Sequence, residues 1–111
     1  MTHEMNLHPG PFGLIKSGHK DIEMRLFDER RKNIKVHDLI VFTNIDTKER
    51  LTVEVINLFV FNNFDELYSH FDKTRFGYNK NEIANPKDME LYYSQEKIQQ
   101  FGVLAIEIKL K

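Results

Sequence analysis

The chain has 111 residues, a formal net charge of −1 and an apolar fraction of 41%, which suits one ordinary domain with a single hydrophobic core. It has no cysteine, which excludes disulfides, thiolate metal sites and cysteine nucleophiles and fits a reducing, cytoplasmic setting. No stretch reaches the roughly 18 apolar residues of a membrane span, and residues 1–12 lack the regions of a signal peptide. We therefore expect one cytoplasmic domain over residues 1–111 that does not contact a membrane.

The first half of the chain is predicted to form a helix and three strands. Pro11 suits the first turn of a helix that ends at Gly18. Residues 22–26 alternate apolar and charged side chains, which is typical of a half-buried strand. Residues 39–42 form a continuous apolar run, and residues 51–61 predict one long strand that bends near Asn57.

The second half is predicted to be mainly helical before a closing strand. Phe64, Leu67, Tyr68 and Phe71 recur at helical spacing after a capping asparagine, Asn62 or Asn63. The polar residues 72–87 predict a long loop, and such loops in small domains are often functional.

Two short elements and a strand follow this loop. Residues 88–93 indicate a short helix or turn, and Ser94 suits the N-cap of a helix that stops at Gly102. Residues 103–110 alternate and predict the last strand. The whole order is strand, helix, three strands, helix, short helix and strand. It indicates an α+β fold with a mixed, mostly antiparallel sheet, curled or barrel-like so that its edges are hidden.

Positive charge is concentrated in one segment. Residues 16–37 contain seven lysines and arginines and four acids, a local charge of +3 that leaves −4 for the rest of the chain. Such a patch suits a phosphate-bearing ligand. A solvated face of mixed charge is the alternative interpretation.

Lys20, Glu23 and Arg25 form the most chemically informative cluster in that segment. Glu23 and Arg25 share one face of the predicted strand, opposite Ile22 and Met24, whereas Lys20 joins them only if the strand begins irregularly. A lysine beside a carboxylate can act as a proton carrier when it is partly desolvated. The alternative is a salt bridge on the solvent face, which contributes about 0–1 kcal/mol.

The spacing Gly18-x-Lys20-x-x-Glu23-x-Arg25 resembles the signature of the ASCH domain family, which is related to the PUA domains. Four further blocks are similar to bacterial ASCH proteins of this length, so the resemblance extends over essentially the whole chain. These blocks are residues 11–18, 34–38, 89–94 and 102–107.

The resemblance implies a small β-barrel with flanking helices and a charged cleft that binds RNA or a nucleotide. Some family members are amidohydrolases that remove the acetyl group from N4-acetylcytidine, and at least one is a ribonuclease. It also implies that His37 stands where the family usually has glycine, so this residue must adopt positive φ or the turn must differ.

If the protein is a hydrolase, the resemblance to the amidohydrolases also indicates its candidate catalytic residues. Lys20 corresponds to the amidohydrolase lysine that acts as base or nucleophile. Glu23 stands where the short amidohydrolases carry a threonine, and Glu90 is the candidate for a glutamate that they use from a later region.

Arg25, Tyr93 and Lys16 are the ligand-binding candidates. By resemblance Arg25 anchors an anion or the substrate, and Tyr93 is an orienting donor. Tyr92 and Tyr93 point apart, so we expect at most one of them in the core, while the other can reach the cleft with its hydroxyl.

We expect no metal site and no cofactor, because the five histidines are scattered and none has the His-x-x-x-His spacing of a local ligand pair. Phe59, Phe61, Phe64 and Phe71 could form a base-stacking platform. Core packing is the favoured interpretation for these four rings.

Three functions remain open from the sequence. The favoured one is an RNA- or nucleotide-binding domain, and the second is a small amidohydrolase that deacetylates N4-acetylcytidine-type nucleosides with Lys20 as base or nucleophile. The third is a ribonuclease, or a protein-interaction domain in which the charged cluster is only structural.

Overall fold

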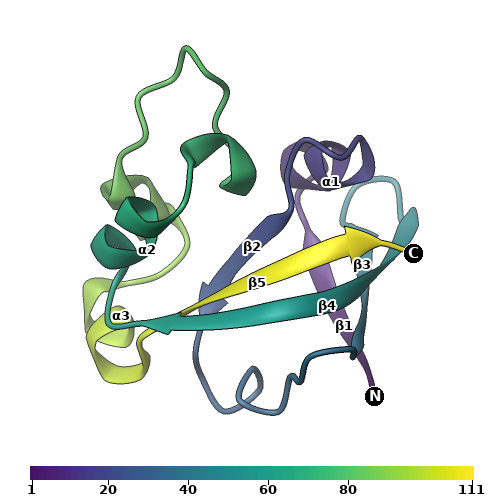
Figure 1. Ribbon diagram of the computed structural model, residues 1–111, viewed down its shortest axis with the longest axis horizontal. Helices are drawn as coiled ribbons and strands as arrows, with labels where there is room; N and C mark the ends of the chain where they lie inside the picture. The colour runs from purple at the N-terminus through teal and green to yellow at the C-terminus, as the bar shows by residue number, and fades with distance from the viewer.

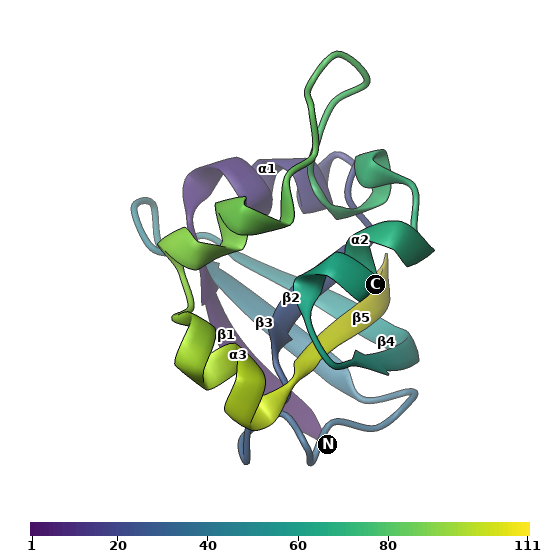
Figure 2. The same ribbon diagram turned by 90° about the vertical axis from the view of Figure 1, so that its left-hand side faces the viewer.

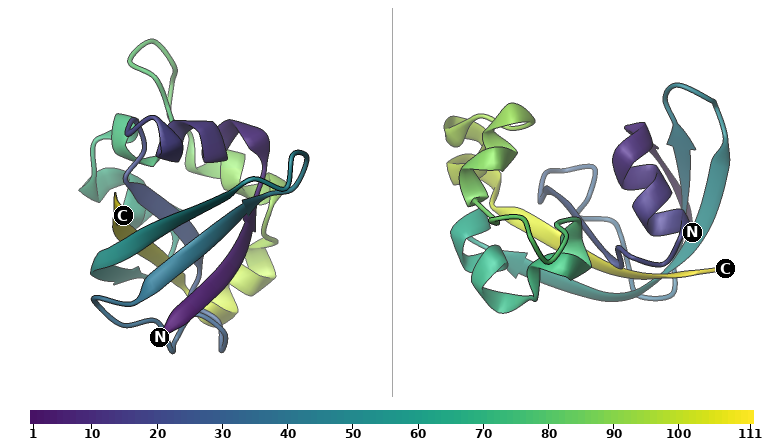
Figure 3. Two further views of the ribbon diagram at one scale, coloured as in Figure 1. Left: turned by 90° about the vertical axis from the view of Figure 1, so that its right-hand side faces the viewer. Right: turned by 90° about the horizontal axis from the view of Figure 1, so that it is seen from above.

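The computed structural model describes residues 1–111, and its centre is a five-stranded sheet in the order β1-β3-β4-β5-β2 (Figure 1). The strands are β1 (Thr2–Leu7), β2 (Ile22–Leu26), β3 (Leu39–Asn44), β4 (Arg50–Phe61) and β5 (Val103–Leu110). β1 pairs with β3 in parallel, and all other pairs are antiparallel. The sheet curls into a half-barrel (Figure 3), so the predicted α+β fold with a curled, mixed sheet and flanking helices is confirmed.

A β-bulge accounts for part of this curl. The register between β4 and β5 shifts between Val55 and Asn57, which is where the sequence predicts a bend. An extra residue on one strand increases the local twist and bends that strand. The bulge therefore lets the long β4 follow the curved surface of the half-barrel.

Three α-helices and two 3-10 helices surround the sheet. They are α1 (Pro9–Lys16), α2 (Phe64–His70), α3 (Gln95–Phe101), η1 (Lys73–Phe76) and η2 (Pro86–Leu91). The predicted caps are confirmed, since the Asn63 side chain accepts from the Glu66 N–H and the Ser94 hydroxyl accepts from the Lys97 N–H. None of the helices combines the length and apolar character that a bilayer crossing needs.

The segment at residues 72–87 departs from the prediction of an uninterrupted loop. It contains η1 and the start of η2, and Phe76, the last residue of η1, is buried. Asp72 and Asn85 cap the two short helices with their side-chain oxygens. These side-chain hydrogen bonds satisfy backbone N–H groups at the start of each helix, which favours short stretches of 3-10 helix inside a polar segment.

Both faces of β5, which lies between β4 and β2, are buried because each face packs into an apolar cluster. Leu104, Ile106 and Ile108 belong to one apolar cluster, and Val103 and Ala105 belong to a second. This arrangement explains the nearly continuous apolar sequence of the strand.

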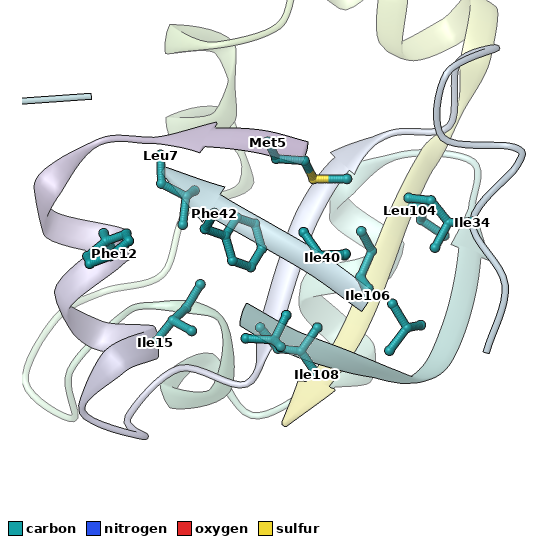
Figure 4. Close-up of a cluster of buried hydrophobic side chains, with 12 residues drawn as sticks. Met5, Leu7, Phe12, Ile15, Ile34, Ile40, Phe42, Leu104, Ile106 and Ile108 are labelled. Carbon is teal, nitrogen blue, oxygen red and sulfur yellow. The ribbon is translucent and has the colours of Figure 1, made fainter. Parts of the chain in front are cut away.

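The two clusters are covered by different helices. Figure 4 shows Phe12 and Ile15 of α1 next to Phe42 and Ile40 in the first cluster. The second cluster is covered by α2, α3 and the 3-10 helices, which lie together on one side of the sheet in Figure 2. α1 and the 3-10 helices therefore stand on either side of β2.

His37 adopts a φ of 78°, which confirms the expectation of positive φ at the position where the ASCH pattern has glycine. Its backbone N–H donates to the Val55 carbonyl at 2.7 Å. Its ring contacts the carboxylate of Glu54 at 3.1 Å. These contacts help to hold His37 in a conformation that residues other than glycine rarely adopt.

Candidate functional site

A cavity of about 650 Å³ is lined by residues of α1, of β2 as its floor and of the segment from η1 to Tyr93. Figure 3 shows how the ribbons of these elements are arranged around β2. The α1 wall is apolar and includes Pro11 and Leu14. The opposite wall is rich in tyrosine. Its side chains include Tyr68, Phe76, Tyr78, Asp88, Met89, Tyr92 and Tyr93.

Lys20, Glu23 and Arg25 meet on the floor of this cavity. The Lys20 Nζ lies 3.0 Å from one Glu23 carboxylate oxygen, and Arg25 contacts the other at 2.8 Å through Nε and Nη2. The three side chains are only 7%, 4% and 13% exposed. The interpretation as a salt bridge on the solvent face is therefore wrong.

The start of β2 explains how Lys20 joins the other two residues. The strand begins at Ile22, so Lys20 precedes it and does not follow its alternation. Ile22 and Met24 face the second apolar cluster, as the pattern predicts, and Glu23 and Arg25 face the cavity. The irregular entry that the sequence analysis required is present.

The trio carries a net charge of +1, and some of its N–H donors have no protein partner. Burial alone would raise the pKa of Glu23, but the charges and hydrogen bonds of Lys20 and Arg25 outweigh it and hold the pKa below its usual value. Nη1 of Arg25 has no protein partner, and the Lys20 ammonium uses only one of its three hydrogens. These free N–H groups can donate to a ligand.

A second hydrogen-bonded group lies on the tyrosine-rich wall. The Tyr78 hydroxyl donates to Oδ2 of Asp88 at 2.6 Å and lies 3.0 Å from the Tyr68 hydroxyl. Burial and the Asp88 hydrogen bond raise the pKa of Tyr78 far above its usual value, and burial raises the pKa of Tyr68. Both phenols therefore stay neutral and serve as donors.

Tyr92 and Tyr93 point to different surroundings, as predicted. Tyr93 stacks on Phe64 with ring centroids 6.1 Å apart, and burial raises the pKa of its hydroxyl. Tyr92 is 57% exposed and stands against His8 at the cavity mouth. Tyr93 is thus the ring that belongs to both the core and the cavity wall.

Two predicted site residues lie outside the cavity. Lys16 forms an exposed ion pair with Glu49, and Glu90 accepts a hydrogen bond from Gln95 on the surface. Neither lines the cavity. The structure brings together Lys20, Glu23, Arg25 and Tyr93 but leaves Lys16 and Glu90 apart from them.

The phenylalanines belong to the second apolar cluster, which confirms the core interpretation. Phe64 is buried, and Phe59, Phe61 and Phe71 pack against the cluster. Phe59 and Phe61 each meet Phe71 edge to face. No group of three histidine or acidic side chains is arranged to hold a metal ion.

A family model described as the ASCH domain matches residues 5–111. The chain belongs to the ASCH domain family. The resemblance to this family is therefore confirmed, and Lys20, Glu23 and Arg25 line the cavity.

Several solved structures share the fold of this ASCH domain. The crystal structure of hypothetical protein PH0355 is similar with a TM-score of 0.84 and 30% identity, over 100% of both chains. The solution structure of protein PF0455 from Pyrococcus furiosus has a TM-score of 0.71 and 32% identity, over 99% of this chain and 97% of that one.

More distant ASCH proteins share the fold alone. A mutant of ZmASCH from Zymomonas mobilis has a TM-score of 0.70 at 13% identity, over 97% of this chain and 68% of that one. A comparison with curated proteins finds no match.

The tyrosine-rich wall of this ASCH domain was not predicted residue by residue. In the sequence, residues 72–87 stand out as a polar segment of possible function, but neither Tyr78 nor Asp88 stands out within or beside it. The available signal was one tyrosine, Tyr78, within a polar stretch, directly after the buried Phe76 and a glycine of positive φ, Gly77.

Proposed function

We propose that this ASCH domain binds a nucleobase in its cavity, as part of a nucleoside, a nucleotide or an unpaired nucleotide of RNA. The observation that carries the proposal is the buried Lys20–Glu23–Arg25 trio, with free donors and a net charge of +1, at the floor of an aromatic cavity. A volume of about 650 Å³ lies within the range of small-ligand sites, roughly 300–1,000 Å³.

The floor and the walls suit different parts of such a ligand. The free hydrogens of Lys20 and Arg25 match the carbonyl oxygens and ring nitrogens of a base, or a phosphate. Leu14, Met89 and Tyr93 offer apolar and aromatic surface for the faces of the ring. Proteins that read single-stranded RNA combine stacking and edge contacts in this way.

The charge of the lining favours a small ligand of low charge. Lys20 and Arg25 are its cations, and Glu23, Glu82 and Asp88 are its acids. The attraction of a long polyanion is therefore weak, and recognition depends on contacts inside the cavity.

A pair of lysine variants tests this proposal. Lys20→Ala and Lys16→Ala change the net charge equally, but only Lys20 lines the cavity. Binding of nucleosides and of a mixed-sequence single-stranded RNA is measured by calorimetry, after circular dichroism shows that each variant is folded. We expect about tenfold weaker binding for Lys20→Ala, the loss of one charge-assisted contact, and less than about twofold for Lys16→Ala.

A third variant fills the cavity and leaves the trio intact. Leu14→Trp adds bulk on the α1 wall and should weaken binding more than Lys20→Ala does. The proposal fails if no nucleoside or RNA binds the wild type. It also fails if Lys16→Ala weakens binding as much as Lys20→Ala, because binding would then depend on overall charge alone.

Amide hydrolysis is a second candidate, favoured by the contact between the buried Lys20 amine and the Glu23 carboxylate at 3.0 Å. In this reaction water adds to the acetyl carbon of N4-acetylcytidine, the C–N bond breaks, and acetate and cytidine leave. Lys20 and Glu23 would carry the proton from the attacking water to the departing nitrogen.

Chromatography of N4-acetylcytidine incubated with the protein tests this second candidate. Cytidine release by the wild type that disappears in Lys20→Ala and persists in Lys16→Ala would support it. Release no faster than the background without protein would exclude this reaction, and the binding proposal would stand on its own assay.

A further inference from the structure

The carboxylate of Asp88 is an acceptor on the cavity wall that keeps one oxygen available to a ligand. We propose that Asp88 selects bases that carry an exocyclic amino group, by accepting a hydrogen bond from that group. Cytosine and adenine are then preferred over uracil and hypoxanthine. This inference rests on the proposed function, since it presumes that a base occupies the cavity.

Tyr78 orients the Asp88 side chain. The Tyr78 hydroxyl has one hydrogen, and its shortest contact, 2.6 Å, is with Oδ2 of Asp88. Tyr68 lies 3.0 Å from the same hydroxyl and can donate to its oxygen. The backbone of Asp88 is fixed in the first turn of η2, where its N–H donates to the Asn85 carbonyl at 2.9 Å.

No basic side chain neutralises Asp88. It takes part in no ion pair, and its Oδ1 has no protein partner. The other acids of the lining are engaged differently. Both oxygens of Glu23 contact Lys20 or Arg25, and Oε1 of Glu82 accepts from the backbone N–H of Asn79 within its own loop.

The cavity therefore offers donors on its floor and an oriented acceptor on its wall. A carboxylate only accepts hydrogen bonds, so it pairs with an amino group and repels a carbonyl oxygen at the same position. A site that hydrogen-bonds one polar group discriminates against an analogue that lacks it. Cytosine and uracil differ by this exchange of amino for oxo, which also turns the neighbouring ring nitrogen from an acceptor into an N–H donor, and adenine and hypoxanthine differ in the same way.

These matched pairs provide the experiment. Affinities for cytidine, uridine, adenosine and inosine are measured by calorimetry, and short single-stranded oligomers of C and of U are measured in parallel. For the wild type we expect cytidine to bind about tenfold more tightly than uridine, and adenosine about tenfold more tightly than inosine.

Two variants of nearly equal shape test the role of Asp88. Asp88→Asn can both donate and accept, so each preference should fall to within about threefold. Glu90→Gln removes the same charge from the same 3-10 helix, outside the cavity, and should keep the wild-type preference. Tyr78→Phe should reduce the preference partly, because it removes the donor that orients Asp88.

The outcomes separate this inference from the proposed function. Equal binding of the amino and oxo partners by the wild type would overturn the inference and leave the binding of bases intact. An unchanged preference in Asp88→Asn would also overturn it. Absence of binding to every nucleoside and oligomer would overturn both.

Discussion

Arg25 in β2 donates a hydrogen bond from Nη2 to the backbone carbonyl oxygen of Asn6 in β1, over 3.0 Å. β1 and β2 are the two outer strands of the sheet, so this contact joins the open edges of the half-barrel. The same guanidinium holds Glu23 on the cavity floor. Closure of the sheet and the geometry of the site therefore depend on one side chain.

Glu23→Gln should destabilise the fold strongly. It leaves the cations of Lys20 and Arg25 buried without their common partner, and breaking a buried ion pair on one side costs about 3–5 kcal/mol. We expect a free energy of unfolding lower by about 3 kcal/mol in urea denaturation. Glu29→Gln, in an exposed pair with Lys32, should change it by less than about 0.5 kcal/mol. Equal effects of the two substitutions would contradict this view of the trio.

Arg75 should connect stability to ligand binding. From η1 it contacts Asp21 through Nε at 3.0 Å and Glu107 of β5 through Nη2 at 2.7 Å. This holds the segment that leads to Tyr78. Because the side chain is 35% exposed, we expect Arg75→Met to lower the free energy of unfolding by only about 1 kcal/mol and to weaken nucleoside binding as well.

Arg75→Lys distinguishes charge from geometry in this contact. Lysine keeps the charge but not the planar fork, so it should restore only part of the loss. Arg50→Met removes an exposed pair with Glu4 and should leave both stability and binding nearly unchanged. Unaltered nucleoside binding in Arg75→Met would show that the bridge does not position the cavity wall.

The faces of the strands could be predicted from the sequence, because alternation has a fixed period. Glu23 and Arg25 lie on one face and Ile22 and Met24 on the other, as the pattern indicates. The positive φ of His37 is one of the two alternatives that the family resemblance implied.

The burial of the trio and the opposite wall could not be predicted, because both depend on contacts between distant segments. The sequence shows the charges of Lys20 and Glu23 but not that they are buried, nor that Phe76 of η1 and Met89 of η2 line the same cavity. Glu90 illustrates the same limit. It follows Met89 directly, yet its side chain turns outward to Gln95.

Asp38 should make the protein lose stability in acid. Its carboxylate accepts from His3 at 2.8 Å and from the backbone N–H of Lys35 at 3.0 Å, and these hydrogen bonds lower its pKa to about 2. Because the unfolded chain has a pKa of about 3.9 for this group, the stabilisation is complete above roughly pH 5 and is lost as the pH falls towards 2. The loss should reach about 2 kcal/mol.

Comparison with Asp38→Asn isolates this group from the other carboxylates. Urea denaturation of both proteins between pH 2 and 6 should give a difference in free energy of unfolding that shrinks as the pH falls. A constant difference across this range would show that protonation of Asp38 does not contribute.

Two glycines should respond to alanine in opposite directions. Gly102 ends α3 with φ 73° and ψ −175°, a conformation that other residues almost never adopt, and an added Cβ would lie 2.9 Å from the Phe61 carbonyl oxygen. Gly102→Ala should therefore destabilise the fold by about 3 kcal/mol.

Gly13 lies inside α1 with no atom within 4 Å of an added Cβ. Gly13→Ala should stabilise it by about 0.5–1 kcal/mol, because alanine loses less backbone entropy in a helix. Thermal unfolding measures both, and a Gly102→Ala protein as stable as the wild type would show that the turn between α3 and β5 relaxes without cost.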